Sequence, residues 1–198
     1  MPPAPVHDPE LPARPRLVLI TGGARSGKSA FAQRLAAARG GTVLYLATAV
    51  AVDAEMAERI ARHRADRPAE WTTVEAPTGA ARAIGAALGD QRAVILEDLA
   101  TLVANHLVGP GHAVPNDRPL ELAEVEARIS TELDELFAAY PSWGADLVVV
   151  TNEVGMGVVP AYPLGRAFRD LLGRANQRVA ARADEVYLLV AGLPLRLK

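Results

Sequence analysis

The chain has 198 residues, of which 50% are hydrophobic and 22% are charged, and its formal net charge is −2 at pH 7. This length fits a single domain with a sizeable core of its own. Cysteine is absent, which excludes disulfides, thiolate metal sites and a cysteine nucleophile. The near-neutral charge argues against nucleic-acid binding, which needs clustered positive charge. No apolar run approaches the ~20 residues that span a bilayer.

The first fifteen residues contain six prolines and no apolar stretch. They predict a disordered leader and not a signal peptide, because proline removes backbone donors and fixes φ. We expect one folded domain over residues 16–198 and, by default, a cytoplasmic protein.

Short apolar runs alternate with longer helical patterns along the rest of the chain. We predict strands that are buried on both faces at Leu17–Thr21, Thr42–Ala47, Trp71–Glu75, Ala93–Glu97, Leu147–Thr151 and Val186–Val190. The helices predicted between them are Lys28–Ala38, Asp53–Ala65, Thr78–Leu88, Leu99–Val108, Leu120–Ala139 and Leu164–Ala183. This alternation predicts an α/β fold whose mostly parallel sheet is covered on both sides.

Two further segments carry turn signals. Residues 191–194 predict a turn into a short final strand at Leu195–Lys198, antiparallel because the connection is so short. Gly109–Pro119 is rich in glycine and proline, which is typical of an exposed loop.

The strongest functional signal follows the first predicted strand and opens the first predicted helix. Its sequence, GGARSGKS, matches the phosphate-binding pattern G-x-x-x-x-G-K-[ST] in the required context. The glycines let backbone N–H groups turn inward toward phosphate oxygens, and the helix start adds a favourable field. The alternative is a glycine-rich turn without a ligand, which we disfavour because the sequence satisfies both pattern and context. Residues 16–198 are therefore expected to form a nucleotide-binding catalytic domain. The pattern assigns nucleotide contacts to Gly22, Gly23, Ala24, Arg25, Ser26, Gly27, Lys28 and Ser29. Lys28 should reach the β- and γ-phosphates, and Ser29 should bind Mg²⁺.

An acidic partner for the metal ion is expected at the end of another strand. The run AVILED ends in Glu97 and Asp98, which point to opposite sides of an extended chain, so only one can easily face the site. A solvated strand end is the alternative interpretation. The sequence lacks the Asn-Lys-x-Asp element by which signalling GTPases read guanine. The D-x-x-G match at residues 170–173 falls within a helical pattern, so we attribute it to chance.

His63 lies on the predicted helix that Asp53 can cap. It falls in phase with Met56 and Ile60, on the apolar face of that helix. Two interpretations fit the spacing: a core histidine bonded to the backbone, or a nucleophilic imidazole flanked by Arg64 and Arg67. An imidazole is largely neutral at pH 7, which suits capture of a phosphoryl or nucleotidyl group.

Several motifs in a fixed order resemble one family. They are LITGGARSGKS, VLYLAT, EMAERIARHRADRPAEWTTVE, VILEDLATLVANHL, VVVTNEVGMGVVP and the segment from FRDLLGRANQR to the final LRLK. The most specific are R-x-x-R-P-x-x-W at residues 64–71 and TNEVGMGVVP at residues 151–160. From about Arg16 to Lys198, the sequence resembles the bifunctional adenosylcobinamide kinase / adenosylcobinamide-phosphate guanylyltransferases of cobalamin biosynthesis.

The resemblance implies a three-layer RecA-like P-loop NTPase fold with a final antiparallel strand, and a homotrimer. It implies phosphorylation of adenosylcobinamide with ATP or GTP, followed by transfer of GMP from GTP through a guanylylated histidine, here His63. Mg²⁺ would be held by Ser29 with Glu97 or Asp98. Further nucleotide contacts are implied at Ala47, Thr48, Ala49, Arg64, Ala65, Asp66, Arg67, Glu75 and Glu97.

The sequence departs from the family pattern at two positions. Relatives often have cysteine where Asp98 stands, which leaves open which acid binds the metal, and some have a second histidine where Arg62 stands. For TNEVGMGVVP we expect a corrinoid or subunit contact, with a surface turn as the alternative. Two other functions remain open: a small-molecule kinase in which His63 is structural, and a non-catalytic nucleotide-binding module.

Overall fold

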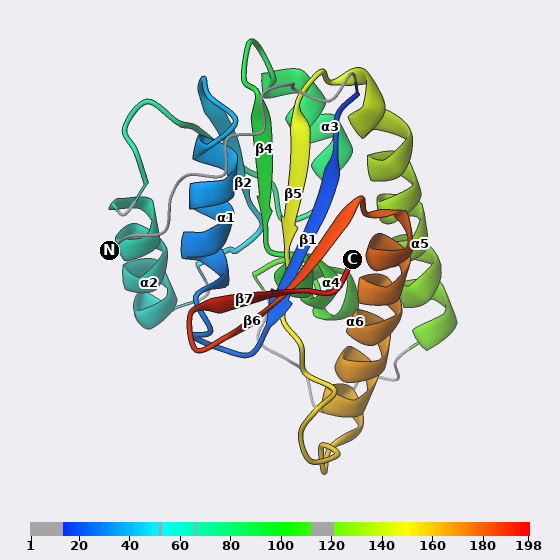
Figure 1. The fold of residues 1–198 in the computed structure, drawn as a ribbon. Helices are drawn as coiled ribbons and strands as arrows, with labels where there is room; N and C mark the ends of the chain where they lie inside the picture. The colour runs from blue at the N-terminus through cyan, green and yellow to red at the C-terminus, as the bar shows by residue number, and fades with distance from the viewer. Residues whose placement is uncertain (1–13, 52, 66, 112–120) are drawn as a thin grey trace.

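Seven strands form one sheet, in the order β3-β2-β4-β5-β1-β6-β7 (Figure 1). The structure is a computed structural model that describes residues 14–51, 53–65, 67–111 and 121–198. All neighbouring strands are parallel except β6 and β7, which are antiparallel. The strands are β1 (Leu17–Gly22), β2 (Val43–Ala47), β3 (Thr72–Glu75), β4 (Ala93–Glu97), β5 (Asp146–Val150), β6 (Glu185–Val190) and β7 (Leu193–Arg196).

Helices cover both faces of this sheet. They are α1 (Lys28–Ala37), α2 (Ala54–Ala65), α3 (Ala80–Ala87), α4 (Leu99–Val108), α5 (Leu122–Ala139) and α6 (Pro163–Arg182), and a 3₁₀ turn (Tyr140–Ser142) follows α5. Figure 1 shows α1 against the sheet and α2 beyond it, on the side away from α5 and α6. The predicted three-layer, mostly parallel fold with a final antiparallel strand is confirmed.

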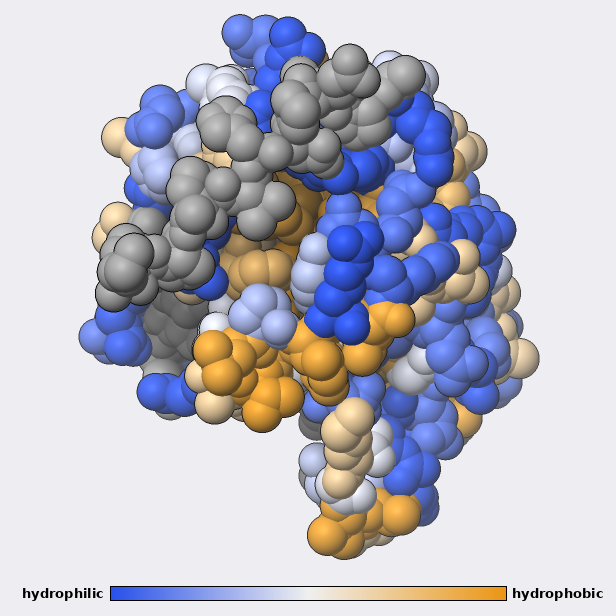
Figure 2. Space-filling model, in the orientation of Figure 1, coloured by the Kyte–Doolittle hydropathy of each residue, from blue (hydrophilic) through white to orange (hydrophobic). Residues whose placement is uncertain are grey.

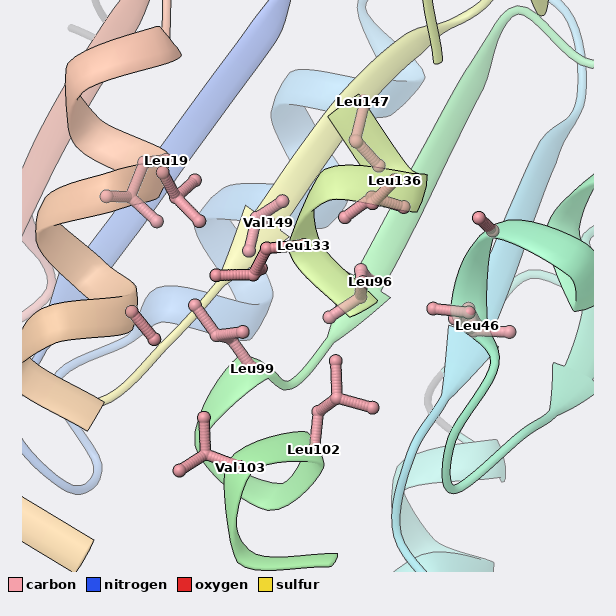
Figure 3. Packing of buried hydrophobic residues seen from close by; sticks show 14 of the residues in the cluster. Leu19, Leu46, Leu96, Leu99, Leu102, Val103, Leu133, Leu136, Leu147 and Val149 are labelled. Atoms are coloured by element: carbon pink, nitrogen blue, oxygen red, sulfur yellow. The ribbon is translucent and has the colours of Figure 1, made fainter. Parts of the chain in front are cut away.

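The strands sort their side chains between two cores because successive residues point to opposite faces. Leu17 and Leu19 of β1 belong to the larger cluster, which includes residues of α3, α4, α5 and α6. Figure 3 shows Leu99 and Leu102 of α4 and Leu133 of α5 in this cluster. In the smaller cluster the other side of the strands, including Tyr45 of β2, packs against Ala32 and Ala36 of α1. Because these strands are parallel, the carboxyl ends of β1, β2, β4 and β5 lie together at one end of the sheet.

All the predicted strands and helices are present, with ends shifted by up to two residues. Burial on both faces is wrong for two of the six strands predicted to have it, because β3 and β6 are only partly buried. β3 lies at a sheet edge, where one flank has no neighbouring strand, and β6 lies next to the exposed edge strand β7.

The last strand begins two residues earlier than predicted, at Leu193. Ala191 and Gly192 alone form the turn, with φ of 50° and 81°, and Val190 pairs with Leu193. This geometry suits a two-residue hairpin, which needs positive φ at both positions. Pro194 suggested a turn residue, but it lies within the strand, where an edge position tolerates the missing N–H.

The predicted leader lies outside the described residues up to residue 13. Arg14 is described, and its guanidinium donates to Asp184 at 2.6 Å. Residues 112–119 of the predicted loop at 109–119 also lie outside the described part. Within the described ranges, no helix has the length and apolarity needed to cross a membrane.

Candidate functional site

The predicted phosphate loop connects β1 to α1. Gly22 and Gly27 have φ of 152° and 94°, and Arg25 has φ of 56°, so the loop curls on itself. A Cβ on Gly22 would lie 2.6 Å from the carbonyl oxygen of Leu189, so this position requires glycine. The buried Ser26 hydroxyl has no hydrogen-bond partner among the described residues. Gly23, Ala24 and Arg25 are exposed, and Gly27 and Ser29 are half-buried. An unsatisfied hydroxyl within a glycine loop fits a phosphate ligand.

The β6–β7 turn supports this loop from outside. The N–H of Gly192 donates to the carbonyl of Ser26 at 2.9 Å. A Cβ on Gly27 would come within 3.1 Å of the Gly192 Cα, so the two backbones pass close together. Sequence reasoning missed this contact, because Ser26 and Gly192 are far apart in the chain. The glycine at the hairpin turn was the only available signal.

Lys28, the first residue of α1, is buried within the curl of the loop, with 8% of its surface exposed. Its ammonium donates to the Gly23 carbonyl at 2.8 Å. Burial lowers the pKa of Lys28, although the carboxylates of Asp98 and Glu97 oppose this shift. The loop therefore holds a desolvated cation beside its own backbone amides, in the manner suited to a phosphate.

The two acids after β4 have different partners. The Glu97 carboxylate accepts from the Ser29 hydroxyl through one oxygen and from the Tyr45 hydroxyl, at 2.5 Å, through the other. Asp98 caps α4: its Oδ1 accepts from the Thr101 N–H at 2.6 Å. Of the two acids, Glu97 is thus the one that meets the phosphate loop.

This donor set fits Mg²⁺. The Ser29 hydroxyl and the Glu97 carboxylate offer the hard oxygen ligands that Mg²⁺ prefers. The described residues contain no group of three or more histidine, cysteine or acidic side chains that could hold a metal by themselves. That is consistent with an ion that takes its other ligands from nucleotide phosphates and water.

The segment after β2 also lies at the carboxyl ends of the strands. Thr48 is fully buried, and its hydroxyl both accepts from the Asp98 N–H at 2.8 Å and donates to the Asp98 carbonyl at 2.9 Å. Its own N–H donates to the Glu97 carbonyl, and its carbonyl accepts from Asn105. Thr48 thus fixes the β4–α4 junction with every polar group it has. Ala47 is buried at the end of β2, and Ala49 is half-buried beside it.

Helix α2 and the connection after it carry Arg64 and Arg67, which we call the basic block. Asp53 accepts from the Met56 N–H at 2.7 Å, which confirms the predicted cap. His63 lies in the last turn of α2, but its side chain, like the whole of Asp66, is outside the described part. Ala65 ends the helix and is exposed. The exposed Arg64 lies 4.0 Å from Glu75 at the end of β3.

Arg67 lies against the face of Tyr45, with its guanidinium carbon 3.6 Å from the ring centroid. Because the Tyr45 hydroxyl bonds Glu97, the basic block connects to the phosphate loop through this ring. Sequence reasoning did not select Tyr45, although the motif VLYLAT contains it. A single hydroxyl in an otherwise apolar strand was the available signal.

The end of β5 adjoins the phosphate loop directly. The N–H of Glu153 donates to the Gly22 carbonyl at 3.0 Å. Asn176 of α6 holds the preceding residues: it accepts from the Thr151 hydroxyl at 2.7 Å and donates to the Asn152 carbonyl at 3.1 Å. The chain then forms an exposed loop, which projects at the bottom of Figure 2. In this loop Met156 and Val158 have exposed fractions of 80% and 94%. A corrinoid or subunit contact there stays a prediction.

Comparison with known proteins assigns the chain to a family. The family model described as "Cobinamide kinase / cobinamide phosphate guanyltransferase" matches residues 18–197. The chain belongs to this family. The bifunctional adenosylcobalamin biosynthesis protein CobU of Salmonella typhimurium is 45% identical over 183 residues, which cover 92% of this chain and 99% of that protein. CobP of Pseudomonas aeruginosa is 39% identical over 91% of this chain and 96% of its own length.

The predicted membership of the cobinamide kinase / cobinamide phosphate guanyltransferase family is thereby confirmed. The match spans the phosphate loop, the basic block and the β6–β7 hairpin. Among solved structures, the RadB recombinase is 16% identical, with a TM-score of 0.46, and the alignment covers 87% of this chain and 73% of that one.

Proposed function

We propose that this chain carries out two reactions at one nucleotide site. It phosphorylates the hydroxyl of adenosylcobinamide with ATP or GTP, and it then transfers GMP from GTP onto that phosphate. The products of the second reaction are adenosyl-GDP-cobinamide and pyrophosphate. The observation that carries the proposal is the contact of Ser29 with Glu97 beside the buried Lys28, within a member of the cobinamide kinase family.

In the kinase reaction, the loop amides and the Lys28 ammonium stabilise the charge that spreads over the γ-phosphoryl oxygens. Ser29 and Glu97 would hold Mg²⁺, which when bound neutralises phosphate charge. We assign this role to Glu97 over Asp98, because the Asp98 carboxylate caps α4. The attacking hydroxyl oxygen forms a bond to the γ-phosphorus and releases its proton to solvent. The bond from the γ-phosphorus to the bridging oxygen breaks, and the nucleoside diphosphate leaves.

In the transferase reaction, an imidazole nitrogen of His63 attacks the α-phosphorus of GTP. A nitrogen–phosphorus bond forms, the bond from the α-phosphorus to the bridging oxygen breaks, and pyrophosphate leaves. A phosphate oxygen of cobinamide phosphate then displaces His63 and takes the GMP. In this proposal the nucleotide also contacts a segment after α2 and the end of β3, through Arg64, Ala65, Asp66, Arg67 and Glu75.

Labelled GTP tests the proposal. With GTP carrying ³²P in the α-phosphate and no acceptor present, we expect an acid-labile label on the protein that is absent from His63→Ala. Glu58→Ala is the matched control: Glu58 is an exposed residue of the same helix, and its loss should leave the label in place. Added adenosylcobinamide phosphate should remove the label as adenosyl-GDP-cobinamide forms.

The alternatives give different results in the same experiment. A small-molecule kinase would move the γ-phosphate of ATP or GTP to cobinamide without any α-label on the protein. A non-catalytic binding module would bind nucleotide and transfer neither phosphate. Either outcome would overturn the bifunctional proposal.

We extend the proposal to the setting of the protein. It works in the cytoplasm as a homotrimer and does not bind nucleic acid. The family resemblance supports the trimer, and the net charge of −2 supports the absence of a nucleic-acid partner. Sedimentation equilibrium of the full chain tests the trimer, which a single species of monomer mass would contradict.

A further inference from the structure

Tyr45 places a lone hydroxyl in an apolar strand. β2 is buried along its whole length, and Tyr45 has only 2% of its surface exposed, in the core that α1 covers. A phenylalanine would supply the same ring to this core. A hydroxyl at this depth requires a partner, and the structure provides one in Glu97.

The Glu97 carboxylate lies between two hydroxyl donors. Ser29 bonds one oxygen and Tyr45 bonds the other. Burial raises the pKa of the Tyr45 phenol well above its ordinary value, and the negative charge of Glu97 raises it further. The phenol is the donor in this hydrogen bond, because an ionised carboxylate can only accept one. Since Ser29 is itself a proposed magnesium ligand, the bond from Tyr45 is the one that remains to orient Glu97.

The Arg67 guanidinium stacks on the face of the Tyr45 ring. Its guanidinium carbon lies 3.6 Å from the ring centroid, and Nη1 donates to the Thr73 hydroxyl of β3 at 3.4 Å. Its Nε is buried and has no hydrogen-bond partner among the described residues. A guanidinium over an aromatic face is attracted by the ring quadrupole, most strongly where water is excluded.

We propose that Tyr45 is a positioning residue that fixes the Glu97 carboxylate beside Ser29 for a magnesium-bound nucleotide, while Arg67 fixes the Tyr45 ring. This inference deepens the proposed function and rests on it. Hydrogen-bond partners that orient metal ligands are worth about 10- to 100-fold in metal affinity or activity. The role predicted for Tyr45 therefore has a measurable size.

The test is Tyr45→Phe, which removes one oxygen and keeps the ring. Tyr187→Phe is the matched control, because the Tyr187 hydroxyl also donates to a carboxylate at 2.5 Å, that of Glu185 in β6. The readout is binding of an N-methylanthraniloyl-GTP probe, followed by fluorescence as free Mg²⁺ is increased from zero. We expect the half-saturating Mg²⁺ concentration to rise about tenfold in Tyr45→Phe and to stay at the wild-type value in Tyr187→Phe.

Further measurements separate positioning from folding. Probe affinity in EDTA should be the same for Tyr45→Phe and wild type, and kcat should return toward the wild-type value at saturating Mg²⁺. Thermal unfolding checks that both variants fold. An unchanged Mg²⁺ dependence in Tyr45→Phe, or an equal change in Tyr187→Phe, would overturn the positioning role. Failure of the proposed function would appear separately, as wild-type protein that binds the probe but transfers neither γ-phosphate nor GMP.

Discussion

At the scale of single residues, the Lys28 ammonium lies where a phosphate ligand would stabilise its charge better than the protein alone does. Burial lowers its pKa, which means that the surroundings disfavour its charged form. A carbonyl of the same loop is its hydrogen-bond partner. We therefore expect Lys28 to serve a ligand and not the stability of the fold.

Lys28→Met tests this arrangement through two opposite effects. We expect γ-phosphate transfer to fall about 10²- to 10³-fold, as when one preorganised donor to a developing charge is removed. The midpoint of thermal unfolding should stay equal or rise, because the variant no longer buries a charge. Radiolabelled transfer and calorimetry on the same preparation measure both effects. A large drop in the unfolding midpoint would instead assign Lys28 a structural role.

The sequence led to the phosphate loop but could not separate the two acids after β4. A pattern of glycines, lysine and serine has one structural solution between a strand and a helix, so Gly22–Ser29 could be assigned directly. The orientation of Glu97 and Asp98 depends on Thr48, which holds the Asp98 backbone from the neighbouring β2. Tyr45 was overlooked for the same reason, since its partner comes from another strand.

At the scale of elements, helix α3 begins on a carboxylate that another helix supplies. Glu132 of α5 accepts from the Gly79 N–H at 2.9 Å and the Ala80 N–H at 2.6 Å, and His106 of α4 donates to it at 3.1 Å. Burial alone would raise the pKa of Glu132, but the bonds from His106, Gly79 and Ala80 outweigh it and lower the pKa. The ionised carboxylate therefore ties three helices together.

Glu132→Gln should destabilise the protein in a pH-dependent way. A lowered pKa in the folded state means that the stabilisation is fully present above the ordinary value of 4.5 and is lost as the pH falls through the folded-state pKa. We expect a difference in unfolding free energy of about 1–3 kcal/mol near pH 7, which shrinks below pH 4.5. Urea unfolding of both proteins between pH 3.5 and 7 measures it. A constant difference across that range would contradict the role given to the ionised form.

The hairpin of β6 and β7 should matter to nucleotide binding through Gly27. Gly27→Ala places a Cβ 3.1 Å from Gly192, whereas Gly40→Ala places one in open space at a similar positive φ of 71°. Both variants should lose about 1 kcal/mol of stability from backbone strain. Only Gly27→Ala should also weaken nucleotide binding, by at least about tenfold or about 1.4 kcal/mol. Titration with labelled GTP compares them, and equal affinities would show that the hairpin contact is unimportant.

At the scale of the whole molecule, the order of elements was predictable and their lateral arrangement was not. Alternating apolar runs and helical patterns indicate parallel strands, and β-branched residues mark the buried ones. Which strands are neighbours depends on tertiary packing, so the partial exposure of β3 and the full exposure of β7 at the two sheet edges could not be predicted. The support that Gly192 gives Ser26 belongs to this level and leaves only a glycine as its signal.

The proline-rich leader should be dispensable. The family match begins at residue 18, and the first described contact is that of Arg14 with Asp184, an ion pair whose arginine side chain is 71% exposed. A chain that lacks residues 1–13 should retain wild-type GMP transfer, with a change in unfolding free energy below about 1 kcal/mol. Kinetics and urea unfolding of the shortened chain measure both. Loss of activity would place the leader within the functional unit.

The position of β1 in the sheet also bears on how the chain folds during synthesis. In the described sheet β1 lies between β5 and β6, and the loop after it is supported by the turn at Ala191–Gly192. The ribosome therefore makes the phosphate loop early but its neighbours and its support much later. We expect this loop to reach its folded form only after β6 and its turn have left the exit tunnel.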